Sequence, residues 1–68
     1  NKNINKRIMI LLYYSLINHV KVSGHIYKSG SLVIKIMRVD DTDEVVVALM
    51  GSLEQFITKE SNLKEFKL

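Results

Sequence analysis

The sequence predicts an α+β fold in which a three-stranded antiparallel sheet carries both helices on one face. Three observations support this class: an apolar run near the start without Gly or Pro, a central region with strand-like alternation, and a capping pattern before the last segment. The expected element order is α-β-β-β-α. The chain of 68 residues is expected to form a single small domain, 1–68, with residues 1–6 frayed.

The first helix is expected over residues 6–19, because the apolar run from Ile8 to Ile17 contains neither Gly nor Pro. A strand that begins near Arg7 is the alternative, because the β-branched and aromatic residues of this run also suit a sheet. A short apolar run has no diagnostic period, so both interpretations stay open. The run is about half as long as a bilayer requires, and we expect no membrane anchor.

Three strands are expected in the middle of the chain. Residues 20–27 alternate between two faces, which predicts a half-buried strand. Turn residues at 28–31 lead into a second strand over residues 32–39, so the two strands should form a hairpin. Acidic residues at 40–43 break this pattern, and three consecutive valines favour a third strand over residues 44–50.

The second helix is expected over residues 53–66. Gly51 ends the third strand, and Ser52 forms a capping box with Gln55 just before the apolar residues of the last segment. Those apolar residues share one helical face. Both helices would then pack on the same side of the sheet.

The α-β-β-β-α order is similar to that of the small Alu-RNA-binding subunits of the signal recognition particle. The segment LVIKIMRVDDTDEVVV, residues 32–47, resembles a hairpin of the smallest subunit of the transcription and repair factor TFIIH. These resemblances concern element order and one hairpin, and they assign no functional residue to this chain.

Neither a catalytic site nor a metal site is expected. The sequence contains no Cys, which excludes thiolate ligands and a Cys nucleophile. The acidic residues at 40–44 lack the Gly and Glu positions of an EF-hand loop and are interpreted as a solvated turn. His19 and His25 have no adjacent carboxylate that would complete a zinc site. We therefore expect no enzyme activity, no cofactor and no small-molecule substrate.

The apolar run near the start predicts a protein partner. Its large side chains point in every direction around a helix axis, and so small a domain has few elements to cover them. The alternative is that this run is buried within its own chain. We expect a non-catalytic assembly subunit, dimeric or part of a larger complex, in which another chain buries Ile8, Leu11, Leu12 and Tyr14.

Binding of RNA or another nucleic acid is the alternative function. Ten Lys and Arg against seven Asp and Glu give a formal net charge of +3. If the strand alternation holds, basic and aromatic side chains share the uncovered face of the sheet, where they suit phosphate contact and base stacking. The candidate residues are Lys21, His25, Tyr27, Lys35 and Arg38.

An intracellular location, cytoplasmic or nuclear, is expected from the lack of Cys and of an export signal. The basic start before the apolar run is similar to a secretory signal, but charged and His residues follow where a small-residue cleavage site would stand. The chain begins with Asn rather than Met, and the sequence leaves open whether an element precedes it.

Overall fold

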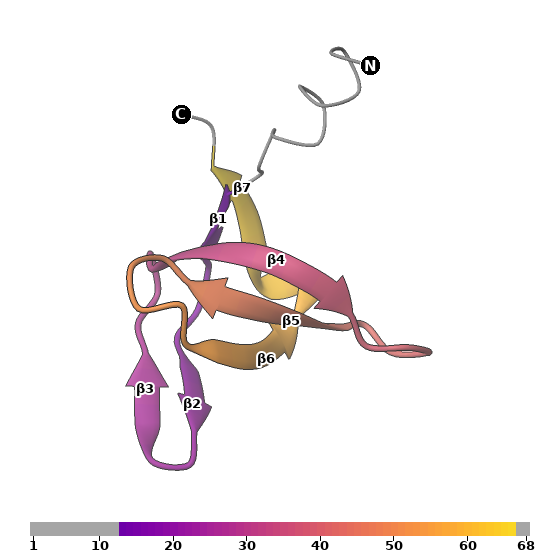
Figure 1. The fold of residues 1–68 in the computed structure, drawn as a ribbon, viewed down its shortest axis with the longest axis horizontal. Coiled ribbons are helices and arrows are strands. Elements are labelled where there is room, and N and C mark those ends of the chain that lie inside the picture. The colour runs from indigo at the N-terminus through magenta and orange to yellow at the C-terminus, as the bar shows by residue number, and fades with distance from the viewer. Residues whose placement is uncertain (1–12, 67–68) are drawn as a thin grey trace.

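A computed structural model describes residues 13–66, and these residues build a fold of strands (Figure 1). In chain order the strands are β1 Tyr13–Leu16, β2 Val20–Val22, β3 His25–Tyr27, β4 Leu32–Arg38, β5 Glu44–Leu49, β6 Gln55–Lys59 and β7 Leu63–Phe66. A short 3₁₀ helix, η1 Glu60–Asn62, joins β6 to β7. Residues 13–66 contain no α-helix. The predicted α+β fold, with two helices on a three-stranded sheet, is therefore wrong.

Five of the strands form one antiparallel sheet in the order β6-β5-β4-β1-β7. The first and last strands are neighbours, because β1 lies between β4 and β7. The consecutive strands β4, β5 and β6 form a meander, which begins one strand later in the chain than expected. The strands β2 and β3 form a separate hairpin that projects from the sheet in Figure 1.

In the described part of the first predicted helix, residues 13–16 form the strand β1 and residues 17–19 form the loop before β2. The strand β1 pairs with β4 on one side and with β7 on the other. Two flanking strands satisfy its backbone and favour β-branched and aromatic residues, so tertiary pairing decides against a helix. The strand alternative is the correct one for residues 13–16. The earlier residues of this predicted helix and the predicted frayed segment 1–6 lie outside the described residues.

The single strand predicted over residues 20–27 is two strands joined by a tight turn. Ser23 and Gly24 have φ angles of 48° and 84°. Positive φ angles at both central residues are what a two-residue type I′ hairpin turn requires. Residues 20–27 alternate between two faces without a visible break, and for this reason the sequence did not predict the turn at Ser23 and Gly24.

The predicted helix over residues 53–66 is replaced by β6, η1 and β7. Side chains of β6 alternate between exposed and buried, with Phe56 and Thr58 inward, and this two-residue period is that of a strand. The hydroxyl oxygen of Ser52 accepts a hydrogen bond from the N–H of Glu54 at 3.2 Å, so it closes a turn and does not cap a helix. Pairing with β5 along the length of β6 outweighs the helical spacing of the apolar residues.

The hydrophobic core lies on the inner face of the five-stranded sheet, and the β2–β3 hairpin packs against one side of it. Its buried cluster consists of Leu16, Val33, Val45, Val47 and Phe56. The hairpin closes this cluster, because Val20 and Tyr27 pack against it and the ring of Tyr27 stacks on Phe56 with centroids 3.9 Å apart. The largest fully buried side chains are three valines, so the core is small.

A β-bulge in β4 sets the direction of two basic side chains. The register with β5 shifts between Lys35 and Met37, which makes Ile36 the extra residue. Lys35 and Arg38 are three positions apart, and the bulge brings both to the inner face. Glu60 of η1 accepts hydrogen bonds from both, with 3.2 Å between Lys35 Nζ and Glu60 Oε2. The bulge thereby ties β4 to the connection between β6 and β7.

The pH dependence of unfolding tests the hydrogen bonds from Lys35 and Arg38 to Glu60. Hydrogen bonds from Lys35 and Arg38 hold the pKa of Glu60 below its ordinary value. The contribution of Glu60 to stability is therefore present above its unfolded-state pKa and is lost as the pH falls through its lower folded-state pKa. In urea titrations at pH 7 and pH 3, the difference in the free energy of unfolding should be smaller for Glu60→Gln than for the wild type.

A double variant with Lys35→Met and Arg38→Met removes the two donors instead of the acceptor. It should also reduce the difference in the free energy of unfolding between pH 7 and pH 3. A Glu60→Gln protein with the wild-type difference between pH 7 and pH 3 would contradict the described role of Glu60.

Candidate functional site

Only one of the residues predicted to bind a protein partner lies in the described part of the chain. Ile8, Leu11 and Leu12 fall outside it. Tyr14 is half-buried in β1 and packs against the core. The Nζ atom of Lys35 lies 5.2 Å from the centroid of the Tyr14 ring, a cation–π contact. The side chain of Tyr14 therefore makes its contacts within its own chain.

Three of the five residues predicted to bind RNA lie in the β2–β3 hairpin, where they are divided between its two faces, and the other two, Lys35 and Arg38, lie in β4. The type I′ turn places His25 and Tyr27 on the face that packs toward the core, and Lys21 on the opposite face. The hydroxyl of Tyr27 donates a hydrogen bond to Oε1 of Glu54 at 2.8 Å, and this bond raises the pKa of Tyr27. With its ring stacked on Phe56, Tyr27 has no open face on that side for a base.

The charges of the described residues also bear on RNA binding. Residues 13–66 contain all seven Asp and Glu but only six of the ten Lys and Arg. The positive net charge of the whole chain thus resides in residues 1–12 and 67–68. Lys35 and Arg38 share Glu60 as an acceptor, which offsets part of their charge. Phosphate binding needs a concentrated basic surface, and the predicted residues do not form one.

The outer face of the five-stranded sheet, opposite the core, is apolar. Cross-strand neighbours form two rows on it: Ala48, Ile34, Tyr13 and Phe66 in one row, and Ile57, Val46 and Met37 in the next. Together these seven residues are called the outer apolar face. Its first row crosses four strands and its second crosses three, so the two rows reach every strand of the sheet.

Three large side chains of the outer apolar face are exposed, whereas Ala48 is buried within the single chain. Met37, Ile57 and Phe66 have exposed fractions of 59%, 47% and 39%. Moving a side chain of this size from full exposure to full burial contributes about 1.5–3 kcal/mol, and covering these three would contribute the part that corresponds to their exposed fractions. Contiguous exposed apolar surface of this kind marks interaction sites on proteins. The outer apolar face is thus the candidate functional site.

Charged residues border the outer apolar face at two opposite corners. Glu44 of β5 and Lys59 of β6 are register partners at one corner. Lys64 of β7 lies at the other corner, where its register partner is Ser15 of β1. The face thus has an apolar centre and a rim with both signs of charge, which is the usual anatomy of a protein–protein interface.

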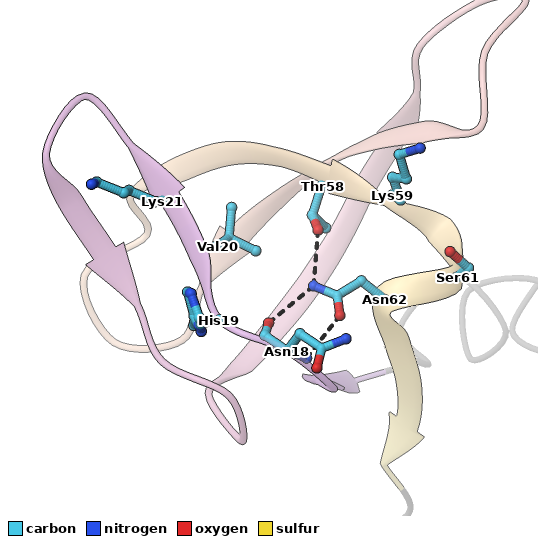
Figure 2. A pocket seen from close by; sticks show the side chains of 8 residues that line it. All are labelled: Asn18, His19, Val20, Lys21, Thr58, Lys59, Ser61 and Asn62. Carbon is cyan, nitrogen blue, oxygen red and sulfur yellow. Dashed lines mark hydrogen bonds between the residues drawn. The ribbon is translucent and has the colours of Figure 1, made fainter.

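A second surface feature is an open hollow of about 430 Å³ between the start of β2 and the end of β6 (Figure 2). The side chain of Asn62 joins its two sides. Its Nδ2 donates to the carbonyl oxygen of Asn18 and to Oγ1 of Thr58, each at 3.1 Å, and its Oδ1 accepts from the N–H of Asn18 at 2.8 Å. Lys21 and Lys59 lie on opposite margins of this hollow in Figure 2.

In residues 13–66, no three His, Asp or Glu side chains gather as a metal site. That part of the chain also holds no helix with the length and apolar character to cross a membrane. No protein-family model, curated protein or solved structure matches the chain.

The sequence prediction did not include any residue of the outer apolar face. The face depends on which strands are neighbours and in which register, and the sequence does not show this. One signal was present: the consecutive valines 45–47 place apolar side chains on both faces of a single strand. A strand of this kind belongs to a sheet that is covered on both faces.

The bridge made by Asn62 can be tested by substitution. Asn62→Ala removes three hydrogen bonds and leaves Thr58 Oγ1 and the Asn18 backbone without them, so the free energy of unfolding should fall by about 1–3 kcal/mol. Asn18 contributes only backbone atoms to these bonds, which makes Asn18→Ala the matched control, with a change within about 0.5 kcal/mol. Equal losses for the two variants in urea titrations would show that the bridge is not what stabilises this corner.

Proposed function

We propose that the protein is a non-catalytic assembly subunit that forms a homodimer through the outer apolar face. The observation that supports this function best is the exposure of Met37, Ile57 and Phe66 on one continuous apolar surface. The free energy falls when another protein surface covers this face and excludes water from it.

The distribution of charge supports a second copy of the chain as the partner. In a two-fold symmetric contact the same patch meets itself, so any charge on its rim must meet an opposite charge on the same rim. A two-fold axis that exchanges the two charged corners would bring Glu44 of one copy near Lys64 of the other. RNA binding has no comparable support, because its predicted residues are divided between faces and partly neutralised.

Charge substitutions on the outer apolar face test the dimer. We expect size exclusion coupled to light scattering to give twice the mass of one chain for the wild type at about 100 µM. The variants Met37→Glu and Ile57→Glu should each give the mass of one chain, because a buried unpaired charge opposes association. Leu53→Glu is the matched control: Leu53 is 63% exposed in the β5–β6 loop and lies outside the face.

The control should leave the dimer intact. A monomeric wild type at this concentration would overturn the homodimer, and a dimer that survives both Met37→Glu and Ile57→Glu would show that another surface joins the copies.

A further inference from the structure

We propose that the free edge of β6 binds an extended acidic segment of a partner protein, which adds to the sheet as a further strand beside the hollow. This edge adjoins the outer apolar face at Ile57 but uses backbone groups, and a face-to-face dimer leaves the edges of the sheet accessible. The proposal therefore does not depend on the dimer.

The backbone of β6 is paired on one side only in the described chain. Within residues 13–66 it is an end strand of the sheet, with β5 as its neighbour. The N–H of Glu60 donates to the carbonyl oxygen of Asp43 at 2.8 Å, which fixes the phase of the β5–β6 ladder. Bonded positions alternate in an antiparallel ladder, so Thr58 and Phe56 also face β5. The backbone groups directed to the free edge are therefore those of Gln55, Ile57 and Lys59.

The edge of β6 lacks the features that usually prevent strand addition. Sheet edges are commonly blocked by Pro, by a bulge or by a charge in the middle of the strand. The sequence of β6 is QFITK, with Ile57 at its centre and its one charged residue, Lys59, at its end. Its pairing with β5 runs without a register shift. An extended peptide can therefore form regular main-chain hydrogen bonds along it.

The hollow next to this edge favours a negatively charged segment. Thr58 and Lys59 line it from β6, and Val20 and Lys21 line it from β2, with His19 beside them (Figure 2). Lys59 Nζ lies 3.9 Å from Oδ2 of Asp43 in an exposed and therefore weak ion pair, and the residues that line the hollow include no Asp or Glu. The lysines on the two margins thus select for carboxylates in the added strand.

The peptide acetyl-Glu-Val-Glu-Val-Glu-Val-Glu-amide is a suitable probe, titrated into the ¹⁵N-labelled full chain and followed by NMR. The amide signals of Gln55, Ile57 and Lys59 should shift, and their hydrogen exchange should slow by about tenfold when the peptide is bound, because these donors become paired. Binding should weaken by about tenfold between 0.05 and 0.5 M salt, since its selectivity is electrostatic.

Matched controls separate strand addition from general attraction. The same peptide N-methylated at every backbone amide keeps its charge but cannot pair, and it should not bind. Lys21→Glu should weaken binding of the unmodified peptide by about tenfold. Lys28→Glu makes the same charge change in an exposed turn outside the hollow and should have a much smaller effect.

Three results would overturn the proposal: equal binding of the N-methylated peptide, no binding of the unmodified peptide at 1 mM, or binding of a six-uridine RNA at this edge in place of the peptide. The titration repeated with Met37→Glu should be unchanged, because Met37 lies on the outer apolar face. Failure of the dimer and failure of this edge site are therefore distinguishable.

Discussion

The pairing of β4 with β5 at the centre of the sheet is the constraint on which the rest of the structure depends. Val33, Val45 and Val47 face inward from these strands and are fully buried. Val46 and Ile34 lie on the same strands and face outward. Successive side chains of a strand point to opposite faces, so consecutive apolar residues make both faces of this sheet apolar. Val20 and Tyr27 of the β2–β3 hairpin pack on the inner face, and the outer face leaves Met37, Ile57 and Phe66 exposed.

A core of this size requires support from specific contacts. Small domains bury a smaller fraction of their surface than large ones, and here the fully buried side chains are mainly valines. The stack of Tyr27 on Phe56 fixes the hairpin over the core. The hydrogen bonds of Asn62 and the shared acceptor Glu60 fix η1 to the loop after β1 and to β4. These contacts hold the corner where the hollow and the free edge of β6 meet.

Local patterns predicted the centre of the fold and failed where distant pairing decides the structure. The predicted strands at 32–39 and 44–50 correspond to β4 and β5, because alternation and β-branched residues act locally. The turn at 23–24 was hidden within a continuous alternation. Ser52 and Gln55 matched a helix cap, yet β6 pairs with the preceding strand β5, and β7 pairs with β1, which is distant in sequence. The outer apolar face depends on these strand pairings, and it could not be predicted from the sequence without knowing them.

The central claim is that the outer apolar face is open in a single chain and covered in the dimer. The most direct measurement is the paramagnetic relaxation that a soluble nitroxide causes at the methyl groups of Met37, Ile57 and Val47, at protein concentrations below and above the dimer dissociation constant. We expect strong relaxation of Met37 and Ile57 in dilute protein, weak relaxation in concentrated protein, and weak relaxation of Val47 throughout. Strong relaxation of Met37 and Ile57 in concentrated protein, or protection in the dilute monomer, would contradict the claim.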